Sequence, residues 1–271
     1  MRAAAPRDYD EIDPPPPWPL SRLYHENSKL TERRALELQE QIARFADGGE
    51  APLLAPTTGT VHPSRPSIAL PRAGRRLFGA RLDDALRGRR SQRGPFAPAR
   101  LGPAQIGALL DLAFGTTGEL PAGETPARSR AFPSAGALYP IEIYVAALDC
   151  PALGRDVHHY DVEHHALSRL AACPARGELE RMIFADGLWD HAALAIVFTG
   201  VFERTQAKYG ERGYRFVLLE AGHAAQNLLL VARSMGLGAA PIGGFCEDAL
   251  GAALGLDEAR ESPVYVVLVG G

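Results

Sequence analysis

Several features that would place this chain in a specialised class are scarce or absent. Among 271 residues there are only three cysteines, at positions 150, 173 and 246. Such an odd and scattered set does not suit a disulfide framework and favours a reducing compartment, so we expect a cytoplasmic protein. The opening residues, MRAAAPRDYDEIDPPPPW, contain no apolar core of signal-peptide length. No hydrophobic run approaches the length that a bilayer requires.

An excess of charge of one sign is also missing. The formal net charge is −3, from 29 basic and 32 acidic residues, which gives no indication of binding to nucleic acid or another polyanion. Hydrophobic residues make up 46% of the chain and charged residues 23%, close to the averages for globular proteins. The length therefore suits one large domain or two small ones with a substantial hydrophobic core.

The first part of the chain is predicted to be an extension, residues 1–74, before a compact domain at 75–271. Residues 1–20 are proline-rich, and PPPP at 14–17 favours polyproline II over packed structure. A helix is expected over Ser28–Ala46, where apolar residues recur at helical spacing. Ala51–Arg72 is rich in Pro, Thr and Ser and reads as a long irregular segment that wraps over the core or a partner.

The compact part predicts an α+β fold, because its strands and long helices do not alternate regularly. Gly115–Arg130 is expected to be a loop. The expected elements are helices at 83–87, 102–114, 179–185 and 216–235, and strands at 141–148, within 158–169, at 192–199 and at 263–269.

The organising stretch runs from Glu203 to Phe245. Its helix, Phe216–Met235, is apolar almost all round and is therefore expected to be buried. Glu220, His223 and Asn227 form a polar stripe, which is more often core polarity at a subunit interface than catalytic. Glycines 236 and 238 signal the end of the helix. The following PIGGF segment lets bare backbone approach another surface, which suits a planar ligand.

Two other motifs have competing interpretations. HHYDVEHH at 158–165 could be imagined as a metal site, but its alternation and central polar turn favour a surface hairpin. GLGAAP at 236–241 follows a helix rather than a strand and lacks a third glycine, so it is not a dinucleotide-binding fingerprint. RRSQR at 89–93 offers forked donors for a phosphate, although from the residues alone a solvated basic loop is the better reading.

Several motifs together resemble one family. KYGERGYR, LLEAGHAAQNLLL and GLGAAPIGGF, with the earlier YHENSK, RRSQR and PSAGALYPIEIYV, are similar to the nitroreductase-like flavoproteins and, within them, to SagB-type thiazoline/oxazoline dehydrogenases. The resemblance covers residues 75–271 well and the first 75 thinly. It implies a mixed β-sheet wrapped by helices, in an intertwined homodimer with FMN at the interface.

The resemblance also implies the cofactor site. The flavin phosphate would be held by Arg89, Ser91 and Arg93, with Arg90 beside them. The flavin ring would meet two small-residue segments, of which the first comes from the partner subunit. These are Pro133, Ser134, Ala135 and Gly136, and then Pro241, Ile242, Gly243 and Gly244. One departure is that many nitroreductases place a basic phosphate ligand after the last strand, whereas this chain ends with Val269-Gly270-Gly271.

Lys208 and Tyr209 are the candidate catalytic residues. Both are poor bases when unperturbed, with pKa values of about 10, and from the residues alone a charged helical face is the preferred reading. The resemblance instead matches them to a Lys-Tyr pair needed for heterocycle oxidation. It implies FMN-dependent oxidation of a peptide-derived azoline, on a peptide or carrier protein and within a biosynthetic complex. The alternatives are an NAD(P)H-dependent nitro or quinone reductase, and a scaffold that binds a peptide or carrier protein without catalysis.

Overall fold

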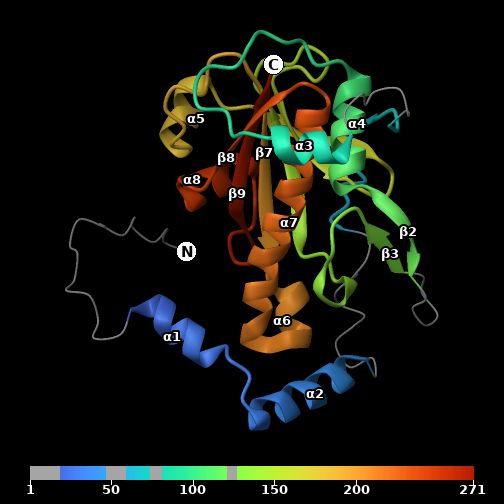
Figure 1. The fold of residues 1–271 in the computed structure, drawn as a ribbon, viewed down its shortest axis with the longest axis vertical. Coiled ribbons are helices and arrows are strands. Elements are labelled where there is room, and N and C mark those ends of the chain that lie inside the picture. Colours follow the sequence, from blue (N-terminus) through green and yellow to red (C-terminus); the bar gives the residue numbers. More distant parts are fainter. Residues whose placement is uncertain (1–18, 47–58, 74–80, 121–126) are drawn as a thin grey trace.

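The computed structural model describes residues 19–46, 59–73, 81–120 and 127–271. A seven-stranded sheet forms the centre of the molecule, with helices around it (Figure 1). Its strands are β1 (Ser67–Ala69), β4 (Ile141–Ala147), β5 (Asp156–Asp161), β6 (Ala166–Ala172), β7 (Ala192–Val201), β8 (Gly238–Ile242) and β9 (Glu261–Gly270). They are ordered β1-β6-β5-β4-β7-β9-β8. The α+β class is confirmed, and the described strand pairs run antiparallel rather than in the mixed sheet that the resemblance implies.

Successive side chains of a strand point to opposite faces of the sheet. The central strands carry apolar residues at both odd and even positions, and both faces of the sheet are therefore buried. In β4, Ile141 and Ile143 join a core with the helices α4 (Pro103–Phe114) and α7 (Gly213–Ser234). The intervening Tyr144 and Ala146 join a second core with α5 (Arg176–Met182) and α8 (Glu247–Leu254). The sheet is therefore the middle layer of a helix–sheet–helix arrangement.

Helix α7 is long, as predicted, but a single chain does not bury it on all sides. Its buried residues, such as Val217, Ala221 and Leu228, recur at helical spacing and face the sheet. Leu218 and Leu219 lie on the opposite side and are 44% and 59% exposed. The expectation of all-round burial is thus wrong for one chain. The helix ends at Ser234, and Gly236 follows with φ of 76°.

Two predictions about hairpins are wrong. Residues 115–130 contain paired strands, β2 (Thr116–Leu120) and β3 (Ala127–Arg130), rather than only a loop. The β5–β6 hairpin is not on the surface, because β5 lies between β4 and β6 and both His158 and His159 are fully buried. Within the described residues, no cluster of three or more His, Cys, Asp or Glu side chains could hold a metal ion.

The N-terminal part forms two helices, α1 (Leu20–Asn27) and α2 (Glu32–Ala46). In Figure 1, α1 lies to the left of α6 (Glu203–Tyr209) and α2 lies beneath it. The sequence predicted α2 from Ser28 and missed α1. Helix α2 starts later because a turn separates it from α1, and Thr31 accepts a hydrogen bond from the Arg34 amide at 3.3 Å.

The predicted tail at 1–20 lies almost wholly outside the described residues, as do residues 47–58. The predicted boundary at 74/75 falls in 74–80, which are also outside them, and stays a prediction. The segment Ala51–Arg72 was predicted to be irregular, and the structure describes its residues 59–72. These contain strand β1, which pairs with β6 at the edge of the sheet. None of the described helices is long and apolar enough to span a membrane.

Candidate active site

The two candidate catalytic side chains converge on one glycine. Lys208 and Tyr209 end helix α6, and Gly136 lies in the PSAGALYP loop. A Cβ added to Gly136 would lie 2.5 Å from the Tyr209 Oη and 2.9 Å from the Lys208 Nζ. Gly136 also has φ of 63°, which favours glycine. The structure thus brings together, within one chain, two motifs that are far apart in the sequence.

The loop at this point has an unusual backbone. Besides Gly136, the residues Ala137 and Tyr139 have positive φ, at 55° and 45°. A residue other than glycine in this region costs on the order of 1–3 kcal/mol and must be held by its surroundings. Tyr139 is held at three points. Its amide donates to Ser134 Oγ at 2.9 Å, its hydroxyl accepts from the Arg130 amide at 2.9 Å, and its carbonyl accepts from Arg204 at 2.9 Å.

A buried group of charges lies under the loop. Glu142 accepts from Arg204 Nη1 at 2.6 Å and from the Thr60 amide at 2.8 Å, and its other oxygen lies 2.9 Å from His159 Nε2. Burial alone would raise the pKa of Glu142, but Arg204 and His159 outweigh that cost and hold the pKa well below its ordinary value. Because Arg204 also belongs to α6, this cluster fixes the loop relative to the helix that carries Lys208.

Glu220 is a second buried carboxyl group beside the same loop. Burial raises its pKa to about 7, and the Ser134 hydroxyl and the charge of Arg130 offset only part of that effect. Neither of its oxygens makes a hydrogen bond of normal geometry within the described part of the chain. A carboxyl group in this state is partly protonated near neutral pH.

Tyr209 is suited to donating a hydrogen bond rather than to accepting a proton. Burial raises the pKa of its hydroxyl above the ordinary value, so the phenol stays protonated at neutral pH. Its ring also packs edge-on against Phe216, with 5.0 Å between ring centroids.

The RRSQR segment follows α3 (Leu82–Gly88), and its arginines are at least partly accessible to solvent. Arg89 is half-buried, whereas Arg90, Ser91 and Arg93 are exposed. Arg90 donates to the carbonyls of Arg87 and Arg89 at 2.9 and 2.7 Å. Within the described residues, no ion pair to a carboxylate involves these arginines. Their forked donors are therefore available to an anion such as a phosphate.

Arg233 is a further basic residue at this place, and sequence reasoning missed it. It belongs to the last turn of α7, and its Nη2 would lie 2.9 Å from a Cβ added to Gly88. Its guanidinium thus lies beside Gly88, directly before RRSQR, and adds a further positive charge there. Its position depends on the packing of α3 on α7, which no local pattern indicates.

The other segments of the implied flavin site lie apart in a single chain. RRSQR is fixed at the C-terminal end of α7, where the Gln92 amide donates to Ala239 at 2.9 Å. Lys208 lies at the other end of this 22-residue helix, which is about 33 Å long. In PIGGF, Pro241 and Ile242 are the end of strand β8 rather than loop, and Gly243 and Gly244 follow it, exposed.

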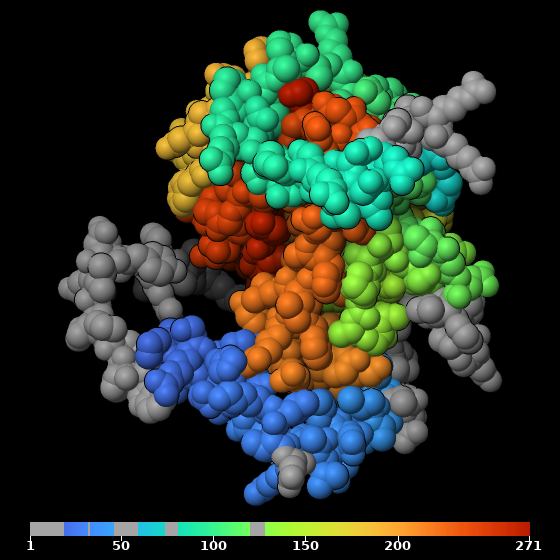
Figure 2. Space-filling view, in the orientation of Figure 1, coloured from blue at the N-terminus to red at the C-terminus, as the bar shows by residue number. Residues whose placement is uncertain are grey.

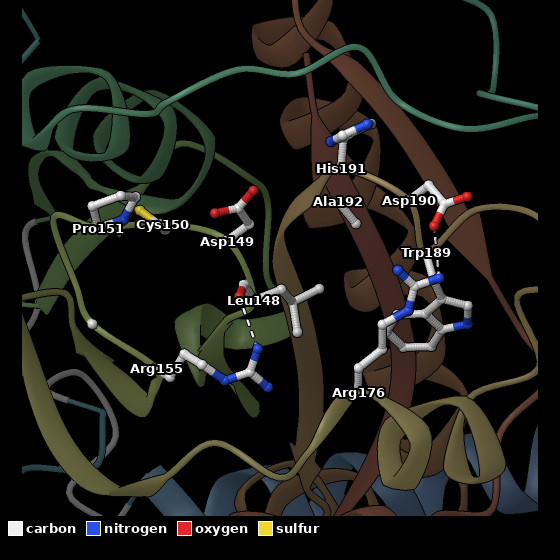
Figure 3. Close-up of a pocket in the computed structure, with 11 residues that line it drawn as sticks. Leu148, Asp149, Cys150, Pro151, Arg155, Arg176, Trp189, Asp190, His191 and Ala192 are labelled. Carbon is white, nitrogen blue, oxygen red and sulfur yellow. Dashed lines mark hydrogen bonds and ion pairs between the residues drawn. The ribbon is translucent and has the colours of Figure 1, made fainter.

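A pocket of about 540 Å³ among the described residues does not lie at this site (Figure 3). It lies between the segment after β4 and the start of β7. Arg155, Arg176, Trp189 and His191 line it among others. Strands β4 and β7 are antiparallel, and Lys208 follows the far end of β7. The pocket is therefore at the opposite end of the sheet from the candidate catalytic pair.

The fold and this arrangement define an α+β protein with a glycine-centred lysine–tyrosine site. Residues 86–271 match the family model described as the nitroreductase family. This is more than half of the chain, and the protein therefore belongs to the nitroreductase family, a family of oxidoreductases.

Two relatives illustrate the range of the family. The chain is 32% identical over 190 residues to a protein of Methanocaldococcus jannaschii named as a nitroreductase. The aligned region covers 70% of this chain and 90% of the relative. It is also 32% identical over 146 residues to the microcin B17-processing protein McbC of Escherichia coli. This aligned region covers 52% of this chain and 54% of McbC. The match thus spans about half of the length of McbC.

Solved structures agree on the fold. A nitroreductase from Ralstonia eutropha has a TM-score of 0.61 at 28% identity, over 79% of this chain and 93% of that one. A chain of the E. coli microcin synthetase McbBCD complex with truncated pro-MccB17 bound has a TM-score of 0.56 at 23% identity. The second match covers 90% of this chain and 98% of that one.

Proposed function

We propose that this protein is an FMN-dependent dehydrogenase that oxidises a peptide-borne thiazoline or oxazoline to the aromatic azole. The observation that carries the proposal is the convergence of Lys208 Nζ and Tyr209 Oη on the bare backbone of Gly136. The similarity to McbC, which is named as a microcin B17-processing protein, supports a substrate of this biosynthetic kind, and we propose a peptide. A nitro or quinone reductase would share the fold but would need no such pair.

Lys208 and Tyr209 would have different roles in this reaction. The ring carbon next to the substrate carbonyl carries an acidified proton, which Lys208 would accept, while Tyr209 would donate a hydrogen bond that orients the ring. When bound, FMN supplies the acceptor for the hydride that leaves the adjacent carbon. Molecular oxygen would be the final acceptor of the two electrons and, with two protons, would leave as hydrogen peroxide. The buried contacts of Arg204 with Glu142 and Tyr139 keep the loop in place during the reaction.

The chain offers a fitting set of groups for FMN. Arg89, Ser91 and Arg93, with Arg233 beside them, would hold the phosphate, since forked guanidinium donors match its oxygens. Backbone at Ser134–Gly136 and at Gly243–Gly244 would lie against the ring. FMN has only a short ribityl chain between phosphate and ring. Groups at the two ends of α7 therefore reach one cofactor only if two chains contribute, and we propose a homodimer with two composite sites.

The proposal is tested with Lys208→Ala and Tyr209→Phe, using FMN-loaded protein and an azoline-bearing peptide. Lys208→Ala is expected to keep its flavin spectrum but lose azoline oxidation by roughly 10²–10⁴-fold, the usual contribution of a general base. Tyr209→Phe is expected to lose less, because the hydroxyl only orients the ring. Arg181→Ala, an exposed change on α5, is the matched control.

The same variants distinguish the reductase. In that reaction the hydride comes from NAD(P)H, and no substrate base is needed. Lys208→Ala would then keep most of its NADPH-driven quinone reduction and have no azoline activity to lose. Unimpaired azoline oxidation by Lys208→Ala would remove the assignment of the base.

A further inference from the structure

Two motifs that are far apart in the sequence, YHENSK at 24–29 and KYGERGYR at 208–215, bind each other directly. Arg212 Nη1 donates to the Ser28 carbonyl at 2.7 Å, and Arg215 Nε donates to Ser28 Oγ at 2.8 Å. Arg215 Nη2 also donates to the His25 carbonyl at 2.8 Å. Ser28 is only 4% exposed as a result. The arginines of KYGERGYR thus hold the turn between α1 and α2.

Aromatic side chains complete this contact. The Tyr24 hydroxyl donates to the Glu211 carbonyl at 3.3 Å. Its ring meets Tyr214 edge-on at 5.3 Å between centroids, and Tyr214 in turn stacks on Phe202 at 5.2 Å. Polar and apolar contacts together fix the N-terminal helices to both ends of the KYGERGYR segment. In the space-filling view these helices, in blue, lie against the orange residues of α6 and α7 (Figure 2).

The docked position brings α2 to the candidate catalytic pair. Gln41 Nε2 donates to the carbonyls of Ala207 and Gln206, at 3.2 and 3.4 Å, in the last turn of α6. One turn further along α2, the Phe45 ring lies 5.6 Å from Lys208 Nζ. An aromatic face at this distance attracts an ammonium group and covers it from solvent.

These helices lie outside residues 86–271, which the family model matches. We propose that α2 is a wall of the active site, docked there by Ser28 on Arg212 and Arg215, and that Phe45 is a positioning residue for Lys208. The proposal rests on the proposed function for its substrate: the azoline would lie between the Gly136 loop and the apolar face of α2. The extension then takes part in the choice of substrate as well as covering the domain.

The test uses the full-length, FMN-loaded protein and the fact that the chain has only two lysines, Lys29 and Lys208. Both are acetylated with an N-hydroxysuccinimide ester, and peptide mass spectrometry gives the ratio of their rates. Phe45→Ala is expected to raise the rate at Lys208 relative to Lys29 several-fold, because the ring no longer covers and holds the amine. Phe45→Trp restores an aromatic face and is expected to return the ratio toward that of the wild type.

Azoline oxidation is measured on separate, unlabelled portions of the same protein preparations. Phe45→Ala is expected to lower kcat by roughly 3- to 30-fold, the range of a cation–π contact, because the ring no longer stabilises the ammonium that forms when Lys208 accepts the substrate proton. Phe45→Leu should not rescue it. Arg215→Ala should act in the same direction by undocking α1 and α2, whereas Arg33→Ala, which removes only an exposed pair with Glu37, should not. Equal activity of Phe45→Leu and the wild type, or an unchanged labelling ratio in Phe45→Ala, would overturn the proposal. If the wild type oxidises no azoline, the proposed function fails, and the labelling ratio still decides the role of Phe45.

Discussion

Glu220 is the residue through which pH should act on the stability of the site. Its pKa is raised from 4.5 to about 7 in the folded chain. An acid with a raised pKa favours folding while it is protonated. Its contribution is complete below the unfolded-state pKa of about 4.5 and is lost as the pH rises through about 7. Buried among Ser134, Ile141 and Arg130, this carboxyl group therefore opposes folding in alkaline solution.

Replacing Glu220 with Gln should remove this dependence while keeping the shape of the side chain. Between about pH 4.5 and pH 8 the wild type should lose roughly 3 kcal/mol of unfolding free energy relative to Glu220→Gln, since one pKa unit corresponds to about 1.36 kcal/mol. Urea unfolding at a fixed protein concentration, at several pH values, measures the difference. Parallel curves for the two proteins would show that the carboxyl group is not buried as described.

At the residue scale, the candidate site residues could be named from the sequence, but the side chains that hold them in place could not. Lys208, Tyr209 and Gly136 could be named only through the resemblance, because on residue pattern alone the lysine and tyrosine belong to a charged helical face. The structure explains that pattern differently. Arg212 and Arg215 of the motif hold the turn at Ser28. The other supports, Glu142, Arg204, Gln41, Phe45 and Arg233, act through contacts between distant segments and have no local signal.

At the scale of elements, periodicity predicted the long helix and the central strands well. Residues 192–199 were predicted as a buried strand, and β7 covers them. The missed hairpin β2–β3 has strands with residues such as Thr116, Gly118 and Arg128, whose mixture of small and charged side chains gives no alternation. The β5–β6 hairpin was misplaced at the surface because its alternation and central polar turn suggest an exposed hairpin, although His159 is buried beside Glu142 and Tyr144.

The length of α7 gives a prediction about assembly. If RRSQR of one chain and Lys208 of another share a cofactor, a mixture of two inactive variants should regain activity. Co-expressed Lys208→Ala and Arg89→Ala/Arg93→Ala chains form mixed dimers in which one composite site is intact and the other carries both defects. We expect each variant alone to be nearly inactive and the purified mixed dimer to have roughly half of the wild-type activity per dimer, since one of its two sites is intact.

The control for this experiment is a mixture of the separately purified variants that has not been allowed to exchange subunits. Activity no greater than that of the single variants, in a mixed dimer verified by mass, would place the whole site within one chain. In that case α7 would not separate the two halves of the site as described.

At the scale of the whole molecule, the family and the α+β class could be predicted, and the arrangement of the extension could not. Helices α1 and α2 pack on α6 through Ser28 and Gln41, and both contacts depend on the closed fold. We propose that the exposed Leu218 and Leu219 are covered in the homodimer, which a single chain cannot show. The proposed function depends on the same scale, because the candidate catalytic pair, the Gly136 loop and α2 come from three distant parts of the chain.

The central claim is that electrons pass from an azoline to bound FMN. It is tested most directly by mixing the FMN-loaded protein with an azoline-bearing peptide in the absence of oxygen and NAD(P)H. The account predicts that the flavin absorbance bleaches in a single turnover, that the peptide loses the mass of one H₂, and that Lys208→Ala does neither. A flavin that stays oxidised with this peptide, yet bleaches at once when NADPH is added, would contradict the account and identify a reductase.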